Sequence, residues 1–480
     1  MATIIEQKPD TVFTNSIIPV GQPIIFTLSN STIVTTYYNV KFVAEVFISG
    51  GIVSNTSLNT DLIGTFKAAP NNKGVGMFDF SAVVENYVKA DNLIGSVLSA
   101  STYKGTSISL SSDPIPPLHL VDKFSINNHA MKWLVIKFNV EGSTTATGIP
   151  AIIPNQDENS INYKIFNGYL KETDKLETSN NDFGFPINAF AEVPIQLGAI
   201  GTGGLRSKFL TNAPTTQYAN IDDYGTFAYL PPQHFPNFDN ILFSYYNSIG
   251  GSLGTEEIEP NLLASSSANV ILSLGYFGCY PANLRNWSST FQTLVTNNTI
   301  QGGYYTVQAR NIANDPISQL YTINVTCPDL KNYESIRLAW LNQWGAWDYY
   351  SFNKKSTRTI STQGSTYTQL EGTWNDSIFR LNGYRGGKKA FRVNATEKIK
   401  MNTDFVSEAD GVWFEDLINS PEVYMLDSFQ TDSAFSMLNT YVTPVRLTTS
   451  SYTRKTIAND KLMQYTFEVE KSKTLRTQAI

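Results

Sequence analysis

The sequence predicts an all-β protein built from tandem β-sandwich-type domains with few short helices. Three observations lead to this fold class. Aromatic and β-branched residues, which favour strands, gather in short runs, and Tyr, Phe and Trp together make up 12% of the 480 residues. Clusters of Gly, Pro, Asn and Ser separate these runs, as turns separate strands. Helical periodicity is confined to two short segments.

Five runs predict strands most clearly. In residues 38–48, every second residue from Val40 to Ile48 is apolar and shares one face, while Lys41 and Glu45 face the other way. This is the period-two pattern of a half-buried antiparallel strand. The other four runs have a similar composition and comprise residues 22–29, 133–140, 162–170 and 240–246.

Two segments predict helices. In residues 81–90, Val83, Val84, Tyr87 and Val88 have the spacing of one helical face, and Ser81 is suited to an N-cap. Residues 414–425 predict a second short helix that ends before Pro421, because the residue before a proline disfavours helical backbone. Neither is long enough to organise a helical domain.

A chain of 480 residues is long for one core, so several domains are expected. Composition changes near residues 150–156 and after the Asn- and Thr-rich residues 297–303. We therefore predict domains at 1–155, 156–327 and 328–480, the last of which holds five of the seven tryptophans. Alternatively, the middle segment completes a sheet begun by its neighbours.

Residues 334–355 predict an aromatic β-hairpin, with strands around Trp340 and Trp347 and a turn at 342–345. Two interpretations of its tryptophans stay open. Trp344 and Trp347 either stack on sugar rings or a partner chain, or they belong to a sandwich core. The core interpretation is favoured, because aromatic cross-strand pairs are ordinary stabilisers of sheets.

Side chains suited to chemistry near neutral pH are scarce. The chain has three histidines, His119, His129 and His234, in unrelated contexts, and two cysteines. Residues 383–392 lack the spacing of a phosphate-binding loop, since Lys388 is followed by Lys389 and not by Ser or Thr. The adjacent acids at 222–223, 256–257 and 415–416 would point to opposite faces of a strand. We expect no enzyme activity, no metal and no cofactor.

Charge and hydropathy limit the partners. Only 16% of residues are charged and the net charge is −6, which argues against nucleic acid and fits a surface covered by neighbours, although Asn, Ser and Thr also supply polarity. The first ten residues lack the apolar core of a signal peptide, and the longest apolar stretch, 271–280, is too short to span a membrane. We expect synthesis in a cytosol, with Cys279 and Cys327 as buried free thiols.

Several segments carry a family resemblance. They are NVKFVAEVFISGG with LIGTFKAAPNNKGVGMFDFSAVVENYV (39–88), KFLTNAP (208–214) with YFGCYPANL (276–284), and IRLAWLNQWGAWDYYSFNKKSTRTI (336–360) with LMQYTFEVEKSKTLRTQ (462–478). Together they resemble virion proteins of tailed phages that infect Bacteroidota, including marine flavobacterial and crAss-like phages.

The resemblance implies a non-catalytic structural role in a virion, in the tail or baseplate, for a protein made in the bacterial cytoplasm. It implies partners among other virion proteins and further copies of the chain, in a multimer that can close into a ring. Two alternatives stay open, a host-surface module that binds a glycan or receptor, and a head or neck accessory protein.

Interface candidates follow from loops and charge, because loops on a rigid scaffold carry interactions. The polar stretches 200–206, 250–260 and 353–372 are expected to be such loops. Two basic segments, if they pack side by side, form a positive patch for an acidic neighbour. Otherwise they are two solvated loops. Their residues are Lys354, Lys355 and Arg358 in the first segment, and Arg385, Lys388, Lys389 and Arg392 in the second.

Overall fold

The computed structural model describes residues 3–9, 17–49, 62–90, 117–119, 123–127, 130–160, 162–169, 176–177, 183–184, 209–229, 239–258, 274–311, 313–326, 333–373, 377–381, 383–426, 442–456 and 463–476. Over these residues the protein is all-β with short helices, as predicted. Two compact units divide the chain. Unit 1 contains Met1–Cys327 and Leu341–Asp348, and unit 2 contains Pro328–Trp340, Tyr349–Thr431 and Ser436–Ile480.

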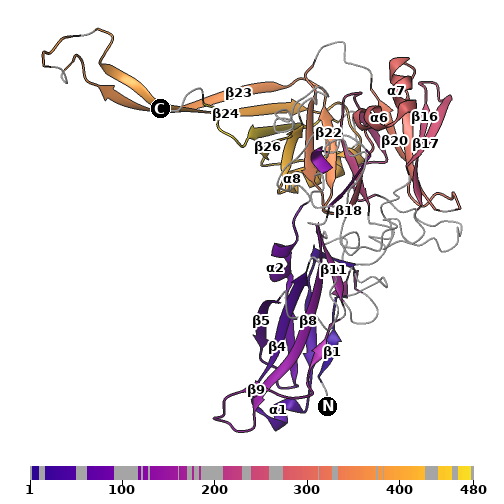
Figure 1. The fold of residues 1–480 in the computed structure, drawn as a ribbon, viewed down its shortest axis with the longest axis vertical. Helices are drawn as coiled ribbons and strands as arrows, with labels where there is room; N and C mark the ends of the chain where they lie inside the picture. The colour runs from indigo at the N-terminus through magenta and orange to yellow at the C-terminus, as the bar shows by residue number, and fades with distance from the viewer. Residues whose placement is uncertain are drawn as a thin grey trace. The chain divides into compact units, whose positions relative to one another are not determined.

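The first part of unit 1 is a β-sandwich (Figure 1). One sheet has the order β1-β3-β6, formed by Ile4–Gln7, Ile25–Ser29 and Val75–Asp79. The other has the order β2-β11-β8-β4-β5, formed by Ile17–Gly21, Tyr163–Tyr169, Met131–Ser143, Tyr38–Ser49 and Leu62–Ala68. The short strands β9 (Ala151–Ile152) and β10 (Glu158–Asn159) also pair with β8.

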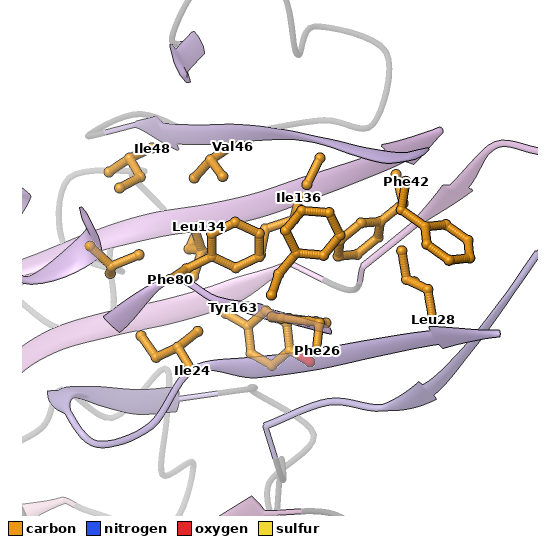
Figure 2. Close-up of a cluster of buried hydrophobic side chains, with 14 of the residues drawn as sticks. Ile24, Phe26, Leu28, Phe42, Val46, Ile48, Phe80, Leu134, Ile136 and Tyr163 are labelled. Carbon is orange, nitrogen blue, oxygen red and sulfur yellow. The ribbon is translucent and has the colours of Figure 1, made fainter. Parts of the chain in front are cut away.

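Aromatic side chains from both sheets fill the core of this sandwich (Figure 2). The Phe26 ring lies 5.4 Å from that of Phe138 and 6.0 Å from that of Tyr163. The alternation predicted for residues 38–48 is present, since Phe42, Ala44, Val46 and Ile48 all join this core. The expectation of a half-buried strand was wrong, however, because Val43 and Phe47 on the opposite face are buried as well.

Strand pairing bears on the division into domains. β11 begins after residue 155 but pairs with β8 and, in parallel, with β2, so residues 163–169 complete the first sheet. β7 (Phe124–Asn127) pairs instead with β18 (Leu274–Gly278). The structure divides the chain into the two compact units given above. The three-domain division stays a prediction.

The second part of unit 1 joins two further sheets. A five-stranded sheet has the order β14-β20-β19-β16-β17, formed by Thr216–Ala219, Tyr321–Val325, Tyr304–Arg310, Asn240–Tyr246 and Ser252–Ile258. A three-stranded sheet has the order β15-β18-β7, in which β15 is Thr226–Tyr229. Phe227 on β15 lies 5.1 Å from Tyr321 on β20, ring to ring, so aromatic packing holds the two sheets together.

Two helices that sequence reasoning missed, α6 (Pro281–Trp287) and α7 (Ser289–Thr296), belong to this second part. Ser288 caps α7, accepting a hydrogen bond from the amide of Phe291 at 2.9 Å. The remaining short elements of unit 1 are α1 (Ile33–Thr36), η1 (Glu85–Tyr87), η2 (Pro117–His119), β12 (Leu176–Glu177) and β13 (Phe183–Gly184).

Unit 2 is one seven-stranded sheet with a helix against it. Its order is β22-β21-β25-β26-β27-β24-β23, formed by Trp347–Phe352, Ile336–Leu341, Val423–Leu426, Val442–Leu447, Thr466–Lys471, Gly387–Asn402 and Thr357–Gln369. Helix α8 (Glu408–Asn419) packs on this sheet through Trp413 and Phe414, whose rings lie 4.9 Å from Trp340 and 5.4 Å from Phe467.

Both predicted helices exist with different bounds. α2 covers only Ser81–Val84 before a 3₁₀ turn, and Ser81 is its first residue while Phe80 is the N-cap. The Ser81 hydroxyl instead accepts a hydrogen bond from the amide of Ile24. α8 begins earlier than predicted because Ser407 and Asp410 form a capping box, and it ends before Pro421 as expected.

Candidate functional site

The most distinctive surface feature is a long two-stranded arm in unit 2, which we define as residues 357–400. β23 and β24 pair from Thr357 with Lys400 to Gln369 with Gly387. β27 joins β24 only over Lys398–Asn402, and one further bridge links Ala395 to Leu475. Past that bridge, the arm continues as two strands alone and runs away from the rest of the sheet (Figure 1).

Strand β23 of the arm is mostly polar and exposed. β23 reads TRTISTQGSTYTQ, and all but its last residue are exposed, so neither face has a core beneath it. Thirteen residues of strand span about 40 Å at ~3.3 Å per residue. We expected a loop over 353–372, and this was wrong, because Thr-rich sequence forms strand wherever a partner strand supplies hydrogen bonds. A two-stranded ribbon is only marginally stable alone, which favours a covering partner.

Large apolar side chains gather at the end of the arm. We call residues 370–386 the arm head, and every structural statement about it concerns the described residues 370–373, 377–381 and 383–386. Tyr384 and Leu381 are 74% and 72% exposed, and three further residues of the head, Leu370, Ile378 and Phe379, are each at least 60% exposed. Exposed apolar groups at this density mark an interaction surface.

The arm head has a defined conformation. The Thr373 amide donates to the Arg380 carbonyl at 3.1 Å, and the Arg380 amide donates to the Thr373 hydroxyl at 2.9 Å. Gly372 has a φ of +78° and lies against the Phe379 ring, where a side chain would collide. These contacts fix the backbone at Thr373 and Arg380 and place the Phe379 ring against Gly372.

Four of the predicted interface residues lie in or next to the head: Arg385 is in the head, and Lys388, Lys389 and Arg392 follow it on β24. The Arg385 guanidinium lies 5.7 Å from the centre of the Tyr384 ring, and the Lys389 ammonium approaches the Tyr384 carbonyl at 3.5 Å. Within the described part of the chain, none of the four pairs with a carboxylate. Their charge is available to a partner.

The other three basic residues lie at the base of the arm, where two of them pair with acids. Lys354 pairs with Asp404 at 3.0 Å. Arg358 pairs with Glu334 and, at 2.6 Å, with Glu397. Lys355 is exposed, and its carbonyl accepts a hydrogen bond from the Asn402 side chain. Charge at the base is thus largely compensated.

Glu397 is the centre of an ion network at this base. Its side chain is 9% exposed and also meets Lys471 at 2.9 Å. Hydrogen bonding to Lys471, and then to Arg358, lowers the pKa of the Glu397 carboxyl, although burial opposes the shift. The hydrogen bonds that the Arg358 guanidinium donates to Glu334 raise the pKa of Arg358, which stays a cation.

The two basic segments do not form one patch, which corrects the expectation from sequence. They belong to the two strands of a single hairpin, not to two hairpins side by side. Arg392 pairs with Ser365, seven residues along β23 from Arg358, so about 23 Å separates the two positions. The sequence could not reveal this separation, because it depends on the register of β23 against β24.

The aromatic hairpin is present, but its tryptophans do not face solvent. Trp344 and Trp347 are 3% and 2% exposed within unit 1, so neither is available for stacking on a ligand or a partner. The Trp344 indole donates to Asn212 at 2.8 Å. Both side chains therefore belong to a core and are not interface residues.

Asn342 explains how the hairpin end is fixed. Its side-chain oxygen accepts hydrogen bonds from the amides of Trp344 at 3.0 Å and Ala346 at 3.1 Å. Its side-chain nitrogen donates to the Leu210 carbonyl and to the Asp348 carboxylate, both at 3.0 Å. Such a buried, satisfied network specifies one conformation.

The other two predicted interface loops have different outcomes. Residues 252–258 within the stretch 250–260 form β17, the edge strand of the five-stranded sheet, so the expectation of a loop was wrong there. Residues 200–206 lie outside the described residues.

One acid of each adjacent pair considered for catalysis has a structural partner. Asp222 pairs with Arg285, and Glu415 with Arg454. Glu256 accepts from the Ser288 hydroxyl. Among the described residues, no group of three or more His, Cys, Asp or Glu is placed to hold a metal ion.

Cys279 is fully buried, while Cys327, His129 and His234 lie outside the described residues. In the same part of the chain, helices are too short or too polar to cross a bilayer.

Sequence reasoning missed the apolar residues of the arm head. They do not alternate with a strand period and are spread over a Gly- and Asn-containing stretch that reads as an ordinary turn. One signal was available: a Thr-rich run without an apolar face, followed by the sequence SIFRLNGYRGG, which places several large apolar residues among turn residues.

Comparison with known proteins assigns no family. No family model matches the chain, and no curated protein matches it. Among solved structures, the chain is similar to Drosophila OTK, extracellular domains 3–5, with 8% identity over 83% of this chain and 92% of that chain, at a TM-score of 0.18. At that TM-score the likeness carries no argument about fold or function.

Proposed function

We propose that this protein is a non-catalytic structural component of a tailed-phage virion, in the tail or baseplate, and that it joins its neighbours through the arm. The exposed arm head carries this proposal. Tyr384, Leu381 and their apolar neighbours remain exposed on a folded loop at the end of a ribbon that has no core of its own. Burial against another protein chain would remove this apolar surface from water.

The resemblance of residues 39–88, 208–214, 276–284, 336–360 and 462–478 to phage virion proteins supports the choice of a virion over other assemblies. A long strand pair is also a common means by which one chain reaches another, since its open edges and exposed faces both offer contacts.

Removing the arm head tests this function. Gln369 and Gly387 are paired across the hairpin, so replacing residues 370–386 with an Asn-Gly turn closes the arm without changing its register. We expect the variant to fold with an unchanged melting temperature and to be absent from purified particles in a complementation assay. Incorporation at the level of the unmodified chain would refute the proposed role of the arm.

A host-surface module that binds a glycan or receptor is the second candidate, because Tyr384 and Phe379 are exposed aromatic rings. The first candidate is favoured because aliphatic residues, Leu370, Ile378 and Leu381, accompany these rings. Sugar sites combine aromatic rings with polar groups, whereas protein interfaces bury aliphatic side chains too. Glycan binding that is lost in Tyr384→Ala would favour the second candidate.

A further inference from the structure

We propose that the arm head of one copy docks on the exposed face at the start of helix α8 of a second copy. This inference rests on the proposed function and names the partner. Three observations carry it: the charge of the distal arm, the chemistry of the α8 face, and the length of the arm.

The distal arm and the rest of the chain have opposite charges. Residues 365–394 contain five basic residues and two acidic ones, a net charge of +3, whereas the whole chain has −6. The remainder of the chain therefore has −9. Among possible partners, a further copy of this same chain is electrostatically complementary to the arm, and opposite charge both speeds association and fixes orientation.

The start of α8 combines negative charge with exposed apolar side chains, as the arm head combines positive charge with them. Residues 401–445 contain no Lys or Arg. Glu408 and Val412 lie one helical turn apart and are exposed, and Phe405, just before the helix, is 55% exposed. The exposed apolar side chains of Phe405 and Val412 thus stand near the acid Glu408, while Asp404 is paired with Lys354. In the arm, the exposed apolar side chains of Leu381 and Tyr384 are followed by the basic residues Lys388 and Lys389.

The arm cannot reach the α8 face of its own chain. The ion pair between Lys354 and Asp404 holds the start of α8 beside the base of the arm. The head lies beyond the thirteen residues of β23 that pair with β24, interrupted by one bulge between Ser365 and Thr366, about 40 Å further on. A paired ribbon of this length does not fold back on itself, so the contact joins two copies. It is a head-to-tail contact, which generates a ring or a filament.

Disulfide cross-linking between two full-length variants tests this contact. Ser377→Cys in the head and Ala409→Cys on α8 change exposed residues and leave the charged and apolar side chains of both surfaces in place. One variant is mixed with the other under mild oxidation. We expect a mixed dimer at roughly tenfold or greater yield than with the control partner Asn72→Cys, which is exposed on unit 1.

Charge reversal gives a second readout. Lys388→Glu together with Lys389→Glu, made in the Ser377→Cys chain, is expected to lower the cross-link yield by about tenfold or more. The control is Lys73→Glu together with Lys89→Glu, two exposed residues of unit 1. This control makes the same change in net charge and is expected to have little effect on the yield. Adding Glu408→Lys to the Ala409→Cys chain should restore part of the yield. A cross-link yield equal to that of the Asn72→Cys control overturns the inference.

The two proposals fail in distinguishable ways. If head removal blocks incorporation into particles but the two variants do not cross-link, the proposed function stands and the second copy is the wrong partner. If head removal leaves incorporation unchanged, the proposed function fails whatever the cross-linking result.

Discussion

Replacing Gly345 with alanine is expected to destabilise unit 1 by about 3 kcal/mol. Gly345 has a φ of +73°, and a Cβ there would lie 2.8 Å from the carbonyl carbon of Asn167 and closer still to its oxygen. Left-handed backbone costs an alanine about 1 kcal/mol. The backbone must also move apart, which weakens two neighbouring hydrogen bonds, Tyr169 amide to Gln343 carbonyl at 2.7 Å and Gly345 amide to Asn342 carbonyl at 3.1 Å. Each contributes about 1 kcal/mol.

Gly250→Ala is the matched control, because it separates the backbone cost from the collision. Gly250 is also in unit 1 and has a φ of +83°, but the nearest atom to its Cβ position is the Tyr304 hydroxyl at 3.8 Å. We expect this variant to lose only about 1 kcal/mol. Urea unfolding, monitored by tryptophan fluorescence, measures the free energy of unfolding of both variants, since Trp344 is buried beside Gly345. Equal destabilisation of the two variants would refute the close contact with Asn167.

Two further predictions concern the arm base and the first sandwich. Glu397→Gln is expected to lower the stability of unit 2 by about 1–3 kcal/mol at neutral pH, because the charged hydrogen bonds from Lys471 and Arg358 are weakened. The control is Glu468→Gln, which weakens the exposed ion pair with Lys398 and should cost under ~0.5 kcal/mol. Because the folded pKa of Glu397 lies below its ordinary value of 4.5, its contribution is present above that value and is lost as pH falls through the folded pKa. The difference between wild type and Glu397→Gln in urea unfolding should therefore shrink on acidification, and a constant difference would contradict the network. Phe26→Ala is expected to cost about 3–5 kcal/mol, since the ring is fully buried among other rings, and a loss below ~1 kcal/mol in the same assay would contradict that packing.

The sequence by itself determined the fold class and the position of the clearest strands. Period-two alternation and aromatic composition are local properties, so residues 240–246 and the strands on either side of the 342–345 turn were found where they were predicted. It also placed the end of α8 before Pro421, since a proline restricts its own neighbour.

Only the tertiary structure decided which of the candidate residues face a partner. Lys388 and Arg358 are similar in sequence context, yet one lies beside an exposed apolar loop and the other is paired with Glu334 and Glu397, because strand register and long-range ion pairs separate them. Trp344 reads as a candidate for stacking, but it is buried, and its indole donates a hydrogen bond to Asn212, which is distant in the sequence. The exposure of a side chain depends on which distant parts of the chain pack over it, and the local sequence pattern does not contain that information.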